Sequence, residues 1–181
     1  MGNSSLIQKA VFLDRDGVIN KAIVKNKNPY PPQSLQEFFI VEDAHELLTG
    51  LKEAGFLLVV VTNQPDVARG QQKRSVVEKM NKLLAEKLPI DDIYVCWEGW
   101  DGMCNCRKPK PGLLVDAAKK HRINMEKSFI IGDRWRDISA GKAASCRTVF
   151  IDYEYDEVLR DKPDCTVTNL RDAVRWIVKQ S

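Results

Sequence analysis

Two carboxylates stand close together directly after an apolar run near the start of the chain. The segment VFLDRDGVIN, residues 11–20, places Asp14 and Asp16 immediately behind three apolar residues. Side chains two positions apart in an extended segment point to the same side, so both carboxylates can face one ligand. Asp and Gly are also common turn residues, and a plain turn is the competing interpretation of this segment.

Residues suited to the same chemistry occur in three later segments. Thr62 ends the apolar run FLLVVVT, Asp133 follows FIIG, and Lys108 stands in CRKPKPG. The carboxylates of Asp14, Asp16 and Asp133 would form the hard oxygen site that Mg²⁺ prefers. A metal ion, a lysine and a hydroxyl around an aspartate nucleophile are what phosphoryl transfer through an aspartyl-phosphate requires.

Four motifs, DRDG, VTNQ, RKPKPG and GDRWRD, resemble in this order those of the haloacid dehalogenase superfamily of phosphatases. The resemblance covers nearly the whole chain. Four motifs in register are also far more specific than any one of them alone. FLDRDGVIN, LVVVTNQ with ARG after it, CNCRKPKPG and IIGD are similar to the branch that contains heptose bisphosphate phosphatases and histidinol phosphatases.

This resemblance implies Mg²⁺-dependent hydrolysis of a small phosphorylated metabolite through an aspartyl-phosphate. The expected substrate is D-glycero-D-manno-heptose 1,7-bisphosphate, which would lose its 7-phosphate. Histidinol phosphate, or another sugar or polyol phosphate, is the alternative within the same class. A receiver-like module that is phosphorylated on Asp14, and a catalytically silent scaffold, are the non-enzymatic alternatives.

The resemblance also implies a role for each matching residue. Asp14 would be the nucleophile, and Asp16 would be the general acid and then the general base. Thr62 and Lys108 would hold the transferring phosphoryl group. The other implied positions are the Mg²⁺ ligands Asp14, Asp133 and the main chain of Asp16, a supporting Asp137, and substrate contacts at Asn63, Arg69, Arg107, Lys110 and Arg134. For Arg69 and Lys110, a solvated surface role is the alternative.

Three of the five cysteines lie together just before RKPKPG. Cys96, Cys104 and Cys106 stand where the resembled branch carries Cys and His ligands of zinc, and Glu98 stands at the His position. These thiolates, with Glu98 or water, could hold a structural Zn²⁺, although structural sites normally use four Cys or His ligands. Three reduced cysteines are the alternative interpretation, and an odd cysteine number without a secretion signal favours a reducing compartment.

Strands and helices must alternate along the chain to position these motifs. Apolar runs predict strands at 9–14, 56–63, 91–96, 127–133, 147–152 and 164–169, and helical spacing predicts helices at 43–55, 73–88, 111–123, 136–146 and 170–180. This alternation predicts an α/β fold with a Rossmann-like, doubly wound, mainly parallel sheet. Because ligands bind beyond the carboxyl ends of such strands, we expect the four motifs to converge there.

Residues 1–181 are expected to form a single domain. A loop insert at about 20–42 and the cysteine loop 96–106 interrupt the alternation, and neither is long enough to fold alone. We therefore expect a site without a cap domain that is screened by loops. A loop as long as 20–42 is usually functional, and a flexible insertion without a functional role is the alternative.

Composition narrows the classes of partner. With 44% hydrophobic and 29% charged residues, the chain is typical of a soluble globular protein. The net charge of +3 is too mild to indicate nucleic acid or an anionic membrane, and no apolar run reaches the roughly 18 residues that span a bilayer. We expect a cytoplasmic monomer that binds a small phosphorylated substrate and neither nucleic acid nor membrane.

Overall fold

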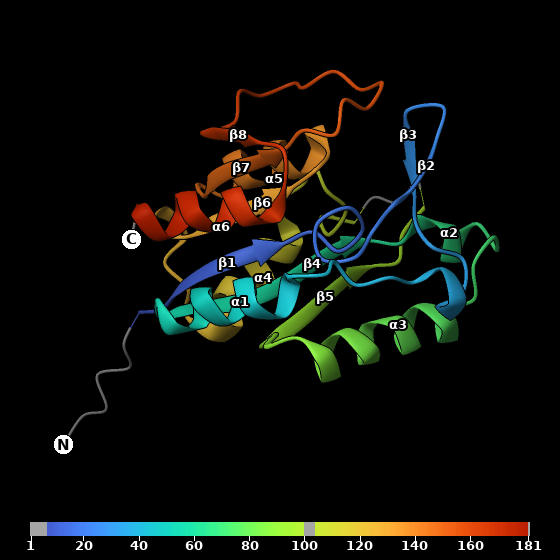
Figure 1. The fold of residues 1–181 in the computed structure, drawn as a ribbon, viewed down its shortest axis with the longest axis horizontal. Helices are drawn as coiled ribbons and strands as arrows, with labels where there is room; N and C mark the ends of the chain where they lie inside the picture. Colours follow the sequence, from blue (N-terminus) through green and yellow to red (C-terminus); the bar gives the residue numbers. More distant parts are fainter. Residues whose placement is uncertain (1–6, 100–103, 181) are drawn as a thin grey trace.

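The computed structural model describes residues 7–99 and 104–180, and a six-stranded sheet runs through its centre (Figure 1). The strands are β1 (Lys9–Leu13), β4 (Phe56–Asn63), β5 (Asp92–Cys96), β6 (Phe129–Gly132), β7 (Arg147–Ile151) and β8 (Cys165–Val167). Their order in the sheet is β5-β4-β1-β6-β7-β8, and every neighbouring pair is parallel. The predicted α/β class with a mainly parallel sheet is therefore confirmed.

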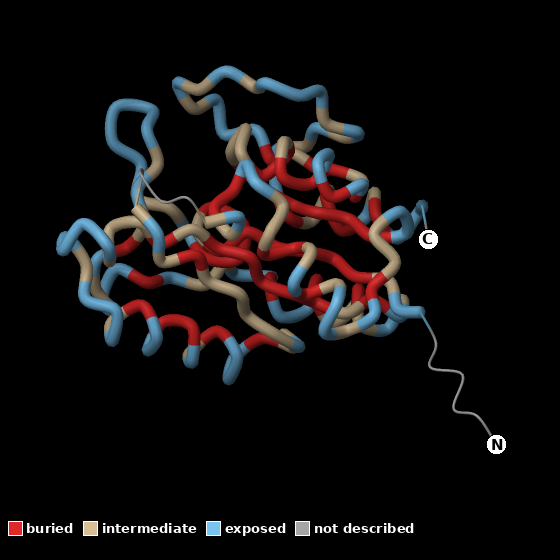
Figure 2. The backbone as a smooth tube through the Cα atoms, turned by 180° about the vertical axis from the view of Figure 1, so that it is seen from behind, coloured by how far each residue is buried: buried red, intermediate tan, exposed pale blue. Residues whose placement is uncertain are grey.

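The central strands are buried on both faces, which explains their near-continuous apolar sequences. In β1, Val11 and Leu13 enter one hydrophobic cluster, whereas Ala10 and Phe12 enter the cluster on the opposite face. Strand β4 shows the same alternation. Figure 2 shows this buried interior as a continuous band through the strands, flanked by exposed loops.

Helices cover both faces of the sheet. Helices α1 (Ala44–Glu53), α3 (Arg74–Lys87) and α6 (Leu170–Lys179) contribute to the first cluster, and α1 and α6 pack against each other (Figure 1). Helices α4 (Gly112–His121) and α5 (Trp135–Ala143) contribute to the second. Shorter elements are α2 (Pro65–Ala68), η1 (Leu35–Glu37) and η2 (Met125–Lys127). None of the helices in the described part of the chain is long and apolar enough to cross a bilayer.

The predicted loop insert contains a small hairpin that sequence patterns did not indicate. Strands β2 (Ile23–Lys25) and β3 (Asn28–Tyr30) pair in antiparallel fashion. Asn26 and Lys27 form the turn with φ values of 50° and 58°, as a two-residue hairpin turn with two positive φ angles requires. The backbone N–H of Asp156 donates to the carbonyl oxygen of Lys27 at 3.0 Å. The hairpin tip thus contacts the loop that joins β7 to β8 (Figure 1).

The order of the strands places a crevice between β1 and β6. From β1 the chain continues to β4 and β5 towards one edge, and it then returns to β6 on the other side of β1. In register, Leu13 pairs with Val60 of β4 and with Ile131 of β6. The polar residues that follow these three strands therefore lie at the same edge, at the switch point where open α/β sheets bind ligands.

We predict that Asp164 stabilises the attachment of β8 to β7. Its Oδ2 accepts hydrogen bonds from the N–H and hydroxyl of Thr148, at 2.7 and 2.8 Å, and its Oδ1 pairs with Lys142 Nζ at 2.8 Å. Asp164→Ala should lower the free energy of unfolding by about 1–3 kcal/mol, measured by denaturant titration. Asp116→Ala, at an exposed position of α4, is the control and should stay within about 0.5 kcal/mol of wild type.

The effect of Asp164→Ala should also depend on pH. Partial burial favours the neutral acid, but the hydrogen bonds from Lys142 and Thr148 outweigh it and lower the pKa of Asp164 below its ordinary value. A lowered folded-state pKa contributes stability that is present above the unfolded-state value and is lost as pH falls through the folded-state value. The gap between wild type and variant should therefore shrink below about pH 4. A gap that stays constant down to pH 2 would contradict this account.

Candidate active site

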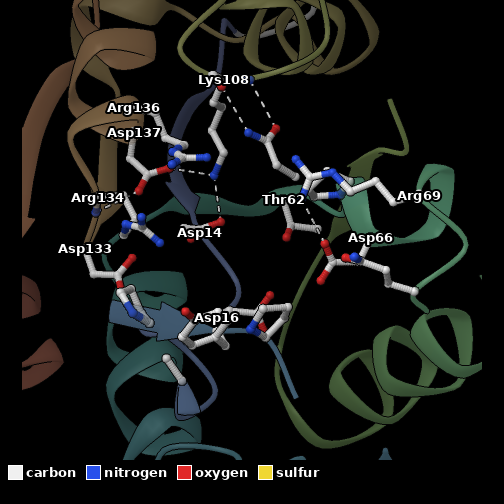
Figure 3. A pocket seen from close by; sticks show the side chains of 17 residues that line it. Asp14, Asp16, Thr62, Asp66, Arg69, Lys108, Asp133, Arg134, Arg136 and Asp137 are labelled. Atoms are coloured by element: carbon white, nitrogen blue, oxygen red, sulfur yellow. Dashed lines mark hydrogen bonds and ion pairs between the residues drawn. The ribbon is translucent and has the colours of Figure 1, made fainter. Parts of the chain in front are cut away.

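A cavity of about 300 Å³ opens beyond the carboxyl ends of β1, β4 and β6. Asp14, Asp16, Thr62, Lys108 and Asp133 all line it, so residues from four separate motifs converge (Figure 3). Of the other predicted residues, Asn63, Arg69, Arg134 and Asp137 also line this cavity.

The ammonium group of Lys108 lies at the centre of the site. Its Nζ is 2.6 Å from Asp14 Oδ1, 2.6 Å from Asp137 Oδ1 and 2.8 Å from the carbonyl oxygen of Val61. Lys108 is only 2% exposed. Burial by itself lowers the pKa of a lysine, but the carboxylates of Asp137 and Asp14 outweigh burial and raise the pKa of Lys108. The group therefore stays positively charged in the interior.

Asn63 holds the main chain of Lys108 in place. Its side-chain Nδ2 donates to the carbonyl oxygen of Lys108 at 3.0 Å, and its Oδ1 accepts from the N–H of Lys108 at 3.1 Å. From the sequence, Asn63 was expected to contact the substrate. In the structure its amide connects the end of β4 to the segment that carries the lysine, while it also lines the cavity.

The carboxylate of Asp16 is held by three side chains to which sequence analysis gave no role. Asn20 Nδ2 donates to Oδ1 at 2.9 Å, and Gln64 Nε2 donates to Oδ2 at 2.9 Å. The fully buried Arg15 pairs with Oδ2 at 2.9 Å and also donates to Asn81 Oδ1 at 2.9 Å. Arg15, Asn20 and Gln64 lie within the motifs named above, but only the fold shows that they converge on Asp16.

Asp14, Asp133 and Asp137 form a compact group of buried acids. One oxygen from each lies within 4.8 Å of the others, and the carboxylate of Asp16 is not a member of this group among the described residues. Burial raises the pKa of Asp14 to about 6, although Lys108 acts in the opposite direction. Burial and the charges of Asp14 and Asp137 raise the pKa of Asp133 well above its ordinary value.

Asp133 is the member of this group that most needs a cation. It is 1% exposed, and no hydrogen bond of normal geometry reaches either of its buried carboxylate oxygens within the described residues, although the hydroxyl of Tyr155 is near enough for Asp133 to raise the pKa of Tyr155. Buried polar groups are normally paired, and a hard cation would satisfy these oxygens. Asp137 is engaged differently, because its Oδ2 accepts from the N–H of Arg134 at 3.0 Å and caps α5. The donor set therefore fits a magnesium ion at Asp14 and Asp133.

Two arginines that line the cavity are held by nearby carboxylates. Arg69 Nη1 is 3.3 Å from Asp66 Oδ1. Arg134 makes a two-pronged contact with Glu157, from Nε at 2.8 Å and from Nη2 at 2.6 Å. Glu157 belongs to the loop between β7 and β8, so this loop holds one of the side chains that line the cavity.

The other two predicted basic residues lie outside the lining. Arg107 is buried and donates from Nη1 to the carbonyl oxygen of Glu98 at 2.8 Å. Lys110 is exposed and donates to the carbonyl oxygen of Cys104 at 3.0 Å. Among the residues the structure describes, neither borders the cavity. Burial, followed by the charges of Arg136 and Arg69, lowers the pKa of Arg107 from its ordinary value.

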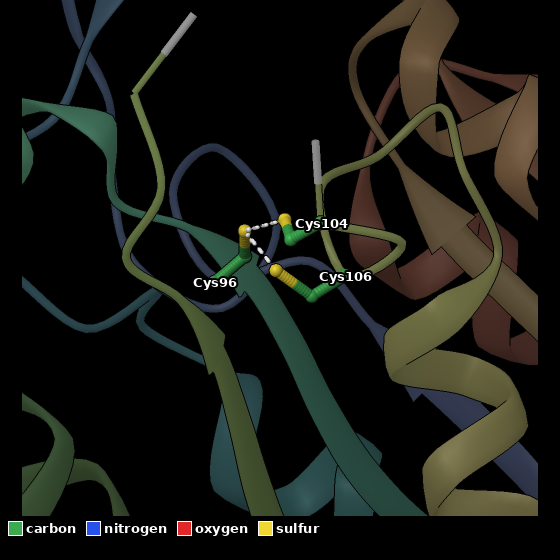
Figure 4. Close-up of side chains that lie close together, drawn as sticks. All are labelled: Cys96, Cys104 and Cys106. Atoms are coloured by element: carbon green, nitrogen blue, oxygen red, sulfur yellow. Dashed lines mark hydrogen bonds between the residues drawn. The ribbon is translucent and has the colours of Figure 1, made fainter. Parts of the chain in front are cut away.

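The three predicted cysteines come together behind the Lys108 segment (Figure 4). The Sγ atoms of Cys96 and Cys104 are 3.6 Å apart, and those of Cys96 and Cys106 are 2.6 Å apart. Glu98 is exposed and is not a member of this group in the described part of the chain. Ligand bonds of about 2.3 Å in a tetrahedral zinc site hold sulfurs nearly 4 Å apart. The Cys96–Cys104 pair approaches that spacing, and the sulfurs of the Cys96–Cys106 pair are too close together.

Comparison with known proteins identifies the relatives of this chain. Residues 105–173 match the model of the HAD-hydrolase-like family. A D-glycero-beta-D-manno-heptose-1,7-bisphosphate 7-phosphatase of Helicobacter pylori is 38% identical over 147 residues, which cover 77% of this chain and 80% of that protein. A protein of the same name from Pasteurella multocida is 36% identical, over 80% of this chain and 82% of its own length.

Solved structures have the same fold. The D,D-heptose 1,7-bisphosphate phosphatase of B. bronchiseptica, complexed with magnesium and phosphate, matches with a TM-score of 0.80 and 24% identity, covering 96% of this chain and 100% of the other. A putative HAD-like phosphatase from Mesorhizobium loti matches with a TM-score of 0.75 and 28% identity, covering 95% and 87%. The fold predicted from the sequence, including its likeness to these phosphatases, is therefore confirmed.

We predict that Gly17 cannot be replaced by alanine, because its missing side chain leaves room for Asp133. Gly17 has a φ of 91°, and a Cβ built on it would collide with the carboxylate of Asp133. Gly17→Ala should therefore lower the free energy of unfolding by about 2–3 kcal/mol, measured by chemical denaturation.

Gly50 in α1 provides the matched control. A Cβ at Gly50 meets nothing within 4 Å, and its φ is not positive. Gly50→Ala should raise stability by up to about 1 kcal/mol, because alanine favours helix interiors over glycine. Equal stability of Gly17→Ala and wild type would show that the close approach of residues 17 and 133 is wrong.

Proposed function

The chain belongs to the family of HAD-like phosphatases, and on that premise we propose that it removes the 7-phosphate of D-glycero-D-manno-heptose 1,7-bisphosphate. The observation that carries this proposal is the Lys108 ammonium between the carboxylates of Asp14 and Asp137, in a cavity that Asp16 and Thr62 also line. The relatives named for this reaction match more than three quarters of the chain. Membership of this family argues against the receiver-like alternative, and the full set of motif residues around one cavity argues against the scaffold alternative.

We assign Mg²⁺ to Asp14 and Asp133, together with the main-chain carbonyl of Asp16. Two buried acids with raised pKa values, one of them with no hydrogen bond of normal geometry to its carboxylate among the described residues, support this assignment. When bound, the ion neutralises charge on the phosphoryl oxygens. We assign Asp137 to the support of Lys108 rather than to the ion, because its two oxygens contact Lys108 and the N–H of Arg134.

The first half of the reaction uses both carboxylates of the DRDG motif. A carboxylate oxygen of Asp14 attacks the phosphorus atom of the monoester, and the bond from phosphorus to the substrate oxygen breaks. Asp16 donates its proton to that leaving oxygen, which departs as an alcohol. The product on the protein is an aspartyl-phosphate at Asp14. The contacts of Asp16 with Arg15, Asn20 and Gln64 support this role, because they fix the direction of its carboxylate.

The second half regenerates the enzyme. Asp16 now accepts a proton from a water molecule, whose oxygen attacks the phosphorus atom. The bond between phosphorus and Asp14 breaks, inorganic phosphate leaves, and Asp14 is again a carboxylate. The charge of Lys108 and the hydroxyl of Thr62 stabilise the phosphoryl oxygens through both steps. The charge of Lys108 suits it to this task because its ammonium already lies against Asp14.

Zinc does not enter this proposal. In the described part of the chain the cysteine group offers three ligands, whereas structural zinc sites normally use four. We propose instead that Cys96, Cys104 and Cys106 act as reduced thiols that pack the segment leading to Lys108. Metal analysis that finds zinc bound to the purified protein would overturn this interpretation.

The proposed reaction predicts phosphate release that depends on Mg²⁺ and on both carboxylates. Asp14→Asn should lower kcat by about 10³-fold or more, because the amide is a poor nucleophile. Asp16→Asn should lower kcat by about 10²–10⁴-fold, because it removes the general acid and base. Chelation with EDTA should abolish turnover, and added Mg²⁺ should restore it. The measurement is release of inorganic phosphate, with Asp116→Asn as the exposed control.

A panel of phosphorylated metabolites tests the substrate. The highest kcat/KM should belong to D-glycero-D-manno-heptose 1,7-bisphosphate, above histidinol phosphate and other sugar or polyol phosphates. A higher value for histidinol phosphate would contradict the proposed substrate and leave the phosphatase chemistry intact. Absence of phosphate release from every compound, including a generic aryl phosphate, would contradict the proposed reaction itself.

A further inference from the structure

Arg136 lines the cavity, although no motif assigned it a role. It stands in the first turn of α5, next to Asp137, and its side chain is 18% exposed. Figure 3 shows Arg136 on the same wall as Asp137, with Arg69 on the facing side. A side chain that borders the cavity from the element that carries Asp137 lies within reach of a substrate bound at Lys108.

Glu157 connects Arg136 to Arg134. The carboxylate of Glu157 contacts Arg134 at 2.6 and 2.8 Å, and its Oε1 lies 3.6 Å from Arg136 Nη2. One negative charge therefore faces two positive charges on this wall. Because the arginines share this carboxylate, their guanidinium groups are held side by side. Two neighbouring guanidiniums are well suited to a phosphate group, whose oxygens match their planar arrays of N–H donors.

A third arginine responds to these charges. Burial and then the charge of Arg136 lower the pKa of the buried Arg107 from its ordinary value, and the charge of Arg69 acts in the same direction. Like charges held together in a partly buried region are unfavourable, and an anion bound among them relieves the repulsion. The arginine side of the cavity thus favours an anionic group.

The opposite requirement holds around Lys108. Asp14, Asp133 and Asp137 lie together there, and Lys108 already contacts two of them and a carbonyl oxygen. With one Mg²⁺, this group of residues can accommodate the phosphoryl group that is transferred. A second phosphate on the same substrate would be repelled by these carboxylates and needs a separate partner.

We propose that Arg136, together with Arg134, binds the phosphate of the substrate that is not transferred, and that Glu157 positions the two arginines for it. This inference rests on the proposed function and deepens it, since it assigns a specific wall of the cavity to the choice of a bisphosphate over a monophosphate.

The test compares two substrates that differ only in the second phosphate. D-glycero-D-manno-heptose 1,7-bisphosphate and the corresponding 7-phosphate present the same bond for cleavage. In Arg136→Gln, the ratio of kcat/KM for the bisphosphate to that for the monophosphate should fall by about 10- to 100-fold, as expected for loss of a hydrogen-bonded charge pair. The fall should appear mainly as a higher KM for the bisphosphate. Arg136→Lys should restore part of the ratio, because it restores charge without the planar donors.

Glu157→Gln tests the positioning role. The two arginines remain, but they lose the carboxylate that orients them, so KM for the bisphosphate should rise by a smaller factor than in Arg136→Gln. Arg160→Gln is the charge-matched control on the same loop. Arg160 stacks on the ring of Trp135 at 3.6 Å and does not border the cavity among the described residues. It should keep the wild-type ratio.

The outcomes separate this inference from the proposed function. If wild type cleaves both substrates and Arg136→Gln keeps the wild-type ratio, the inference is wrong and the proposed function stands. If Arg136→Gln and Arg160→Gln lower the ratio equally, the effect is long-range charge and the inference is wrong.

If wild type cleaves neither compound, the proposed function fails, and calorimetry on the same proteins with Mg²⁺ decides the inference. A bisphosphate affinity at least about 10-fold weaker in Arg136→Gln than in Arg160→Gln supports it. Equal affinities overturn it.

Discussion

The buried ammonium of Lys108 is the interaction on which the rest of the site depends. Burying a lysine without a partner is strongly unfavourable, and so is burying several carboxylates side by side. Here each offsets the other, because Lys108 contacts Asp14 and Asp137 at 2.6 Å. Removing Lys108 would leave both carboxylates without this partner, and removing either carboxylate would leave Lys108 with one carboxylate in place of two. The site is therefore a single interdependent unit assembled from three segments that are distant in the sequence.

The fold satisfies this constraint by aligning the ends of three parallel strands. The apolar runs, their lengths and their alternation with amphipathic helices could be read from the sequence, because buried parallel strands have near-continuous apolar sequences. The ends of those strands then located Asp14, Thr62 and Asp133. The contacts that place Lys108 beside these residues could not be predicted from the sequence. The hydrogen bonds between Asn63 and Lys108, for example, depend on packing rather than on spacing along the chain.

Other features were missed for identifiable physical reasons. The hairpin β2–β3 has strands of three residues that are mostly exposed, so they show no periodic apolar pattern. The contact between its tip at Lys27 and Asp156 joins residues far apart in the chain. Arg136 was missed because spacing alone does not say which way a side chain in the first turn of a helix points. Asp156, which contacts the hairpin tip, and Glu157, which contacts Arg136, both lie in the loop between β7 and β8, and loops have the weakest sequence patterns.

These loops form or support part of the cavity lining. Pro29, Tyr30 and Pro31 of the hairpin line one side of it, and Glu157 of the β7–β8 loop holds the arginines on another. The ends of the strands and the Lys108 segment thus carry the acids, the hydroxyl and the lysine of the cavity, whereas these loops line or support the rest of it. A volume of about 300 Å³ suits a small metabolite.

The most direct test of the central claim is to trap the phosphoryl group on the protein. Wild-type protein would be mixed with ³²P-labelled heptose bisphosphate and Mg²⁺, quenched in acid within milliseconds, digested and mapped by mass spectrometry. The account predicts a hydroxylamine-sensitive label on the peptide that contains Asp14, and its loss when Lys108→Met is added. Label on another residue, or phosphate release from an active enzyme that never carries label, would contradict it.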